Sequence, residues 1–127
     1  MAHWNLWAGW TGMMFGLVSG AIIGLQFHRE EFAGGYPSFR RRMLRLGHLA
    51  FFGLGIVNVL FALTLTSSGV ALRYSAIASA SLAAAVFIMP AVCFLTAWKK
   101  PFRHLFPLPV VLVATALILL LESLVKQ

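Results

Sequence analysis

The chain has few charged residues, only three acids and a single cysteine. Asp, Glu, Lys and Arg make up 10% of its 127 residues, whereas they make up about 25% of a soluble globular domain. Hydrophobic residues reach 61% and the mean hydropathy is +0.89, so the composition excludes an ordinary water-soluble domain and indicates a membrane protein. The lone Cys93 excludes an intramolecular disulfide and a cysteine-based zinc or iron–sulfur site.

Common catalytic signatures are also missing. The sequence has no G-x-S-x-G, no H-E-x-x-H, no phosphate-binding glycine loop and no pair of carboxylates within an apolar run. We therefore expect no enzymatic activity. A net charge of +7 would suggest a nucleic-acid partner in a soluble chain. Here the basic residues flank apolar runs, so we expect contact with a membrane and no nucleic acid.

Four apolar runs are long enough to cross a bilayer, which takes about 20 residues of helix. They cover approximately residues 5–27, 43–67, 72–98 and 107–125. The chain is therefore predicted to be a single all-α membrane domain, residues 1–127, with four transmembrane helices in a compact antiparallel bundle. Residues 1–10 contain no Lys or Arg, so we expect the first run to be a retained helix and not a signal peptide.

Basic residues are concentrated in the loops at residues 28–42 and 99–106 and in the adjoining helix turn. Eight of the ten lie there: Arg29, Arg40, Arg41, Arg42, Arg45, Lys99, Lys100 and Arg103. The positive-inside rule makes this side cytoplasmic and places both termini outside, in the periplasm if the membrane is a bacterial inner membrane. All of these except Arg29 form a basic patch that we expect to bind anionic lipid headgroups or an acidic subunit.

A ladder of glycines runs along the first apolar run, at Gly12, Gly16, Gly20 and Gly24. Residues four apart lie above one another on a helix, so the ladder forms a flat surface that a second backbone can approach closely. Small residues also repeat every four positions in the third run, at Ser75, Ser79 and Ala83. The pattern leaves open a seam within the chain, a subunit interface, or a contact with a cofactor or lipid.

Polar residues within the runs are the main candidates for function, because a polar group in hydrocarbon is expensive. His48, Asn58 and Thr66 fall near one face of the second helix, and Asn58 is expected to hydrogen bond between helices. No ionisable residue lies deep in a run. Glu122 is the only acid within the four runs, and we expect it to form a surface ion pair with Arg73.

His48 has two interpretations. The ordinary one is a hydrogen bond to a backbone carbonyl or a lipid headgroup, with no cofactor bound. The alternative is an axial ligand of haem b, or a metal ligand, acting with His28 or His104. Depth disfavours the second interpretation, because only His48 lies clearly inside an apolar run.

The sequence as a whole favours an accessory or scaffold subunit of a larger inner-membrane complex, such as a respiratory or other energy-transducing assembly. Its partners would be membrane lipids and other membrane-protein subunits, in an oligomer or hetero-complex. Two alternatives belong to different classes. One is a small b-type cytochrome that uses His48, and the other is a homo-oligomeric channel or carrier built on the glycine face.

Overall fold

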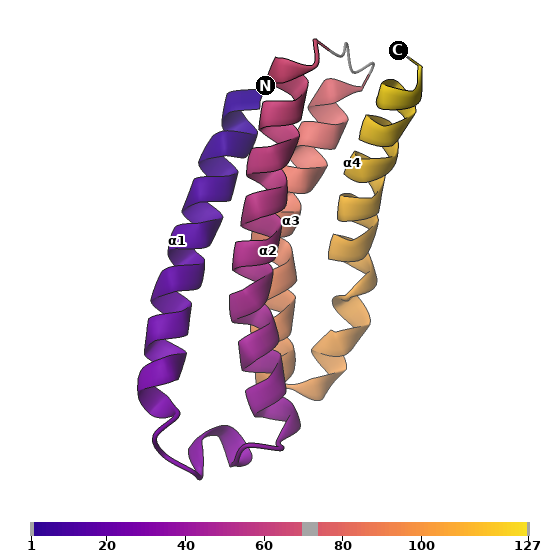
Figure 1. Cartoon of the computed structure of the whole chain (residues 1–127). Coiled ribbons are helices and arrows are strands. Elements are labelled where there is room, and N and C mark those ends of the chain that lie inside the picture. Colours follow the sequence, from indigo (N-terminus) through magenta and orange to yellow (C-terminus); the bar gives the residue numbers. More distant parts are fainter. Residues whose placement is uncertain (1, 70–73, 127) are drawn as a thin grey trace.

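The computed structural model describes residues 2–69 and 74–126, and this part of the chain is helical with no strands. Four long helices are α1 (Ala2–Gln26), α2 (Phe39–Ser67), α3 (Ser75–Trp98) and α4 (Pro107–Val125). Two short 3-10 helices, η1 (Phe32–Gly34) and η2 (Lys100–Leu105), lie in the connections (Figure 1). Four helical segments are long and apolar enough to cross a membrane, as the sequence predicted.

Two helices begin earlier than expected. α1 begins at Ala2 and not at residue 5, and α2 begins at Phe39 and not at residue 43. Ser38 caps α2, since its hydroxyl oxygen accepts a hydrogen bond from the backbone N–H of Arg41 at 3.1 Å. The first basic residues after this cap therefore lie on the first turn of α2 and not in a loop. Residue 72, the predicted start of the third run, lies outside the described residues, and α3 begins at Ser75.

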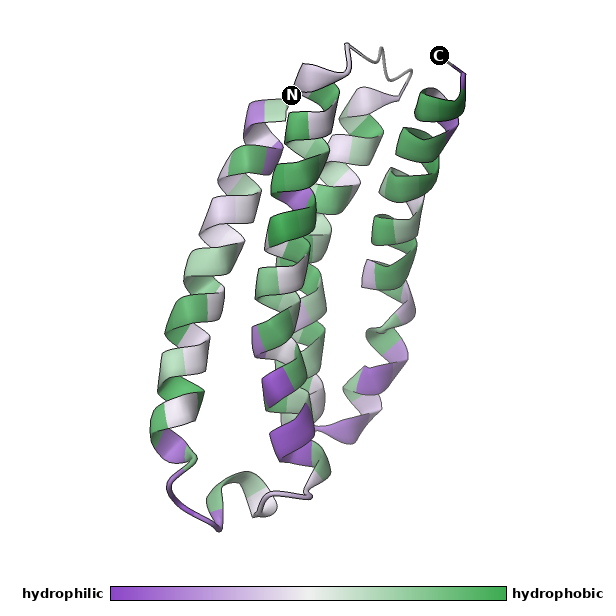
Figure 2. Cartoon of the chain, viewed as in Figure 1, coloured by the Kyte–Doolittle hydropathy of each residue, from purple (hydrophilic) through white to green (hydrophobic). Residues whose placement is uncertain are grey.

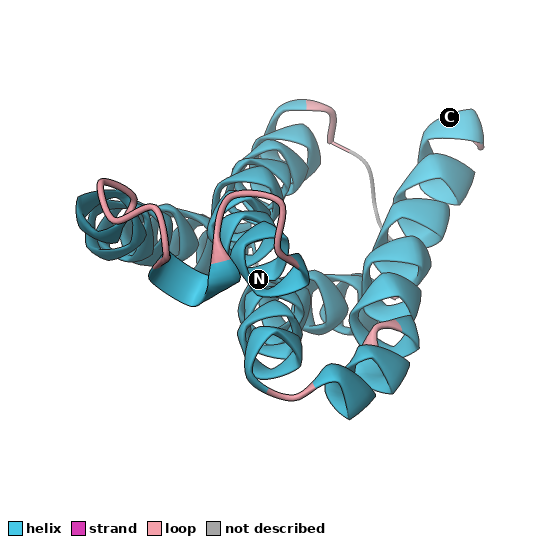
Figure 3. Ribbon diagram, turned by 90° about the horizontal axis from the view of Figure 1, so that it is seen from below, coloured by secondary structure: helices cyan, strands magenta, loops and turns pink. Residues whose placement is uncertain are grey.

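The four helices alternate in direction, and α2 and α3 lie between α1 and α4 (Figures 1 and 3). α1 packs mainly on α2 and less extensively on α3, whereas α4 packs mainly on α3. Both charged connections lie at one end, which we call the basic end, and Ala2 and Val125 lie at the other. Hydrophilic residues gather at the basic end, and the middle of the helices is mostly apolar (Figure 2).

The buried apolar core lies where α2, α3 and α4 meet. Phe61, Ala78, Leu82 and Ala116 are its fully or almost fully buried members. Large apolar side chains also cover the outside of the molecule; for example, Trp7 is 71% exposed on α1 and Ile118 is 62% exposed on α4. Such surfaces are unfavourable in water and suit contact with lipid, in agreement with a membrane protein.

Candidate functional site

A buried polar cluster joins three helices. Asn5 of α1 and Asn58 of α2 are completely buried, and Ser79 of α3 is 5% exposed. Asn5 Nδ2 donates hydrogen bonds to Asn58 Oδ1 at 2.8 Å and to the Ser79 carbonyl at 3.1 Å. The Ser79 hydroxyl donates in turn to Asn5 Oδ1. Residues 53 and 74 positions apart in the sequence are thus tied together inside the apolar part of the molecule.

The remaining polar atoms of this cluster are also paired. Asn58 Nδ2 donates to the Leu54 carbonyl of its own helix at 2.9 Å and to the Leu82 carbonyl of α3 at 3.0 Å. A buried amide without partners costs roughly 1–3 kcal/mol, so this pairing removes the penalty of placing two amides among apolar side chains. Because its donors and acceptors are used internally, the cluster fits a role in holding helices together.

Asn5 was not singled out by the sequence analysis, although a signal for it exists. Asn5, Gly9, Gly12 and Gly16 are the buried residues of α1, and their spacing of four, three and four places them on one helical face. Because Asn5 continues the row of buried glycines, its side chain faces the same neighbouring helices as they do. Asn5 was missed because it is the first residue of the predicted apolar run, where a polar residue is expected at the boundary.

Gly9 and most of the glycine ladder pack against other helices of the chain. A Cβ atom added to Gly9 would lie 2.7 Å from the Gly55 carbonyl oxygen, and one added to Gly55 would lie 2.8 Å from the Gly9 carbonyl oxygen. The backbones of α1 and α2 therefore touch at this crossing, where only glycine fits. Gly12 faces Val86 of α3, and Gly16 faces Phe52 of α2.

The two lower glycines of the ladder differ from each other. Gly20 lies directly against the imidazole of His48, so a side chain there would collide with the ring. Gly24 has open space where a Cβ would be. On α3, Ser79 is buried, and Ser75 and Ala83 are half-buried. Ser79 meets α1 at Asn5, and Val86 meets it at Gly12. The bulkier Val86 is accommodated because Gly12 has no side chain.

His48 lies half-buried between α1 and α2. The Gly16 carbonyl oxygen accepts a hydrogen bond from its Nδ1 at 2.7 Å, and the ring meets Phe52 edge-on with centroids 5.5 Å apart. A hollow of about 250 Å³ lies beside it, lined by residues of α1, of α2 and of the turn after α1, among them Gly24, Arg45 and Phe27. His48 therefore bonds to a backbone carbonyl and contacts an open space at the same time.

The other two candidate haem or metal ligands lie elsewhere. His28 is exposed beyond the end of α1, with its Nδ1 2.6 Å from the Leu25 carbonyl oxygen, and His104 is exposed in η2. Neither lines the hollow beside His48. Within residues 2–69 and 74–126, no group of three or more His, Cys, Asp or Glu side chains is placed to hold a metal ion.

Two further sequence candidates have local partners. The Thr66 hydroxyl is exposed and donates to carbonyls of its own helix, Ala62 at 3.1 Å and Leu63 at 3.0 Å. It therefore does not extend the buried polar cluster. Glu122 forms an ion pair with Lys126, the residue directly after the end of α4. Arg73, its predicted partner, lies outside the described residues.

One member of the predicted basic patch has a different role. Arg41 is only 3% exposed, and its guanidinium donates to the Phe27 carbonyl at 3.0 Å and lies 4.4 Å from the Phe27 ring centroid. The Phe27 carbonyl belongs to the turn that ends α1, where the helix dipole is negative. Arg41 thus joins the start of α2 to the end of α1 and is not available at the surface.

The remaining basic residues lie at the surface of the basic end. Arg45 is half-buried, with its guanidinium 4.9 Å from the Tyr36 ring centroid. Arg40 donates from Nε to the Ala97 carbonyl near the end of α3 at 3.0 Å. The exposed cations of the patch are Arg40, Arg42, Lys99, Lys100 and Arg103. The patch is therefore carried by two elements far apart in the sequence, the start of α2 and the α3–α4 connection.

Comparison with known proteins gives no relative: no protein-family model, no curated protein and no solved structure matches the chain. Function must therefore be argued from the contacts within the molecule.

Proposed function

We propose that the protein is an accessory or scaffold subunit of a larger membrane complex, with the basic end cytoplasmic and both termini on the other side, as in a bacterial inner membrane. The observation that carries this proposal is the pairing of Asn5, Asn58 and Ser79 with one another and with backbone carbonyls. A carrier or enzyme keeps polar groups available for its substrate, whereas these join helices. We also propose that the whole chain is one domain and that its four helices form a compact antiparallel bundle in the membrane.

The glycine ladder cannot be the main docking surface for a partner. Of its four members, Gly12, Gly16 and Gly20 already face atoms of α2 or α3, as does the nearby Gly9, and only Gly24 faces open space. A partner subunit would instead contact the outer apolar faces, above all that of α4, in which only Pro109 and Ala116 are buried. An interface of this kind has no need of polar residues, because close side-chain packing drives helix association in lipid.

Native mass spectrometry tests the proposal. The tagged protein is extracted from its own host membranes in mild detergent and its mass is compared with that of a tagged, unrelated four-helix membrane protein expressed at the same level. We expect stoichiometric larger assemblies that the control does not give. A chain that is always recovered alone, or only as a homo-oligomer, would contradict an accessory role.

A b-type cytochrome is the second candidate, and one contact favours it. The His48 Nδ1 is engaged by the Gly16 carbonyl, which leaves Nε2 as the nitrogen available to a metal. Metal-bound histidines commonly donate their other ring N–H in this way. A reducible Soret band in the purified protein, lost in His48→Ala, would support haem, and His28→Ala and His104→Ala would identify a second ligand. Wild-type protein without that band would end the hypothesis.

A further inference from the structure

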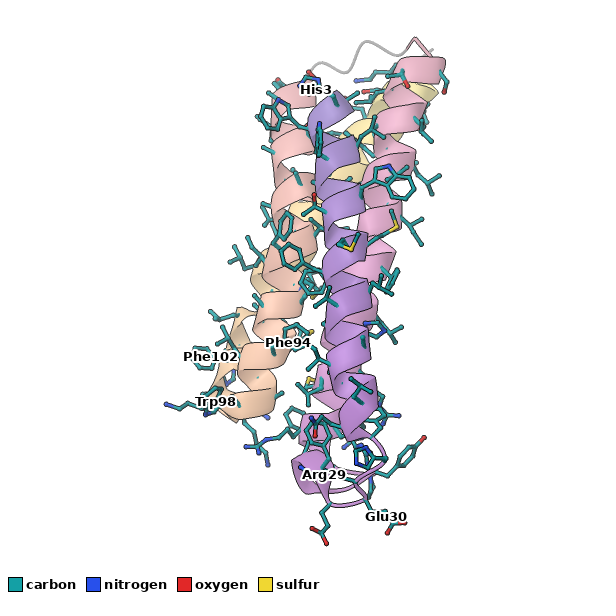
Figure 4. All side chains as sticks on the ribbon, turned by 90° about the vertical axis from the view of Figure 1, so that its left-hand side faces the viewer. His3, Arg29, Glu30, Phe94, Trp98 and Phe102 are labelled. Atoms are coloured by element: carbon teal, nitrogen blue, oxygen red, sulfur yellow. The ribbon has the colours of Figure 1, made fainter. Side chains whose placement is uncertain are left out.

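A hollow of about 430 Å³ opens at the basic end, between α2 and α3. It is lined by Arg40 and Leu44 of α2 and by Phe94, Ala97 and Trp98 of α3. Four of these five side chains are apolar, and the only charged one is Arg40. Phe94 and Trp98 follow one another down the lower part of α3, toward the loop end of the molecule (Figure 4). The hollow thus has apolar walls and one cationic residue.

The apolar wall of this hollow is held firmly in place. The Phe94 ring lies against Gly47 of α2, where an added Cβ would be 2.7 Å from the ring. The ring also contacts Phe51, with centroids 6.2 Å apart. Trp98 is 78% exposed, which suits an indole at a membrane–water boundary. Phe94 is therefore the packed ring of the wall, and it cannot turn to fill the space without losing these contacts.

The charge at the mouth of the hollow is not balanced by the residues around it. Arg40 uses its Nε for the Ala97 carbonyl, and its Nη groups have no protein partner in the part of the chain that the structure describes. The chain continues from Trp98 directly into Lys99 and Lys100, both exposed. No acidic side chain lines the hollow. The bond from Nε also orients the guanidinium plane, which is the arrangement that binds a phosphate with two parallel hydrogen bonds.

We propose that this hollow is a binding site for one anionic phospholipid. Its phosphate would contact the Nη groups of Arg40 and the neighbouring lysines, and one acyl chain would lie along Leu44 and Phe94. The charge is confined to one end of an otherwise apolar space, which fits an amphiphile with a single anionic end better than it fits a protein helix. Basic pockets between membrane helices bind acidic headgroups for this reason.

Trp98 provides the test, because the other three tryptophans, Trp4, Trp7 and Trp10, lie on α1 and are exposed. They are replaced by Phe, and the protein is placed in nanodiscs of phosphatidylcholine. A small fraction of the lipid carries brominated acyl chains, which quench a nearby indole, and is either phosphatidylglycerol or phosphatidylcholine. We expect brominated phosphatidylglycerol to quench Trp98 at several-fold lower mole fraction. Equal quenching by the two lipids would overturn the proposal and leave the hollow to an acidic protein partner.

Two variants separate a site from general electrostatic attraction. Arg40→Gln should lower the preference for phosphatidylglycerol about fivefold, which corresponds to about 1 kcal/mol. Arg42→Gln removes the same charge from an exposed residue that does not line the hollow, and should leave the preference nearly unchanged. Equal losses in both variants would overturn the proposal. If Arg40→Gln loses helical structure, Leu44→Phe is the variant to measure. It keeps every charge, and its larger side chain should lower the preference for phosphatidylglycerol by narrowing the hollow.

Discussion

The two outer helices, α1 and α4, are attached to the central pair α2–α3 in different ways. α1 is joined by hydrogen bonds from Asn5 and by backbone contact at Gly9. α4 packs through apolar side chains, with Ala116 buried against Phe61 and Leu82. Between Pro107 and Leu121, no side chain of α4 hydrogen bonds to another helix in the described part of the chain.

The difference matters because lipid is as apolar as the helices themselves. In a bilayer, an apolar helix gains little by leaving lipid for protein, so close packing and hydrogen bonds decide how tightly it is held. α1 has both kinds of contact along one face. α4 has mainly one kind, and its exposed Ile118 and Val111 present apolar surface to whatever surrounds the protein. We infer that α1 is held more tightly to the central pair than α4, and that α4 is the helix better suited to contact a partner.

The largest expected effect comes from the crossing of α1 and α2. Gly9→Leu forces a side chain into the Gly55 carbonyl, which is backbone and cannot rotate away. We expect the free energy of unfolding to fall by about 3 kcal/mol, at the upper end for overpacking. Titration with sodium dodecyl sulfate in mixed micelles, followed by circular dichroism, measures this. Gly24→Leu is the matched control: Gly24 has open space where a side chain would lie, so this variant should change the stability little. Equal losses in the two variants would contradict a close contact between α1 and α2 at Gly9.

The next effect concerns the polar cluster. Asn58→Leu leaves Asn5 buried without its amide partner, so we expect a loss of about 2 kcal/mol in the same titration. Thr66→Val removes a hydroxyl that bonds only within α2 and should have almost no effect. The double variant Asn5→Leu with Asn58→Leu should cost less than the sum of the two single variants. Additive losses would show that the two amides do not share a bond.

The smallest effect is expected on α4, and it tests the comparison directly. Ala116→Leu introduces the same side chain as Gly9→Leu at another buried contact. Because α4 packs mainly on α3, it is able to shift outward and relieve the overlap, and we expect a loss of about 1 kcal/mol. Ile118→Leu, on the exposed face, is its control. If Ala116→Leu destabilises as much as Gly9→Leu, α4 is held as tightly as α1.

Secondary structure was largely predictable, because runs of apolar residues and their charged boundaries are properties of the chain itself. The fourth run, residues 107–125, matches α4, and the others differ by a few residues at their starts. These differences have a local cause at α2, where the Ser38 cap starts the helix before the apolar run begins. Arg41 lies on the first turn of α2 and is buried, and a count of basic residues cannot distinguish it from the exposed Arg42.

The sequence alone determined four membrane-length helices, the concentration of cations at one end and a face of small residues on α1. These follow from composition and from the helical period. Only the tertiary structure decided that Gly9 meets Gly55, that Asn5 pairs with Asn58 and Ser79, and that Arg40 stands at the mouth of an apolar hollow. The reason is physical. The helical period determines which residues of one helix share a face. Which other helix that face contacts depends on how all four helices pack, and this packing brings together residues that are far apart in the chain.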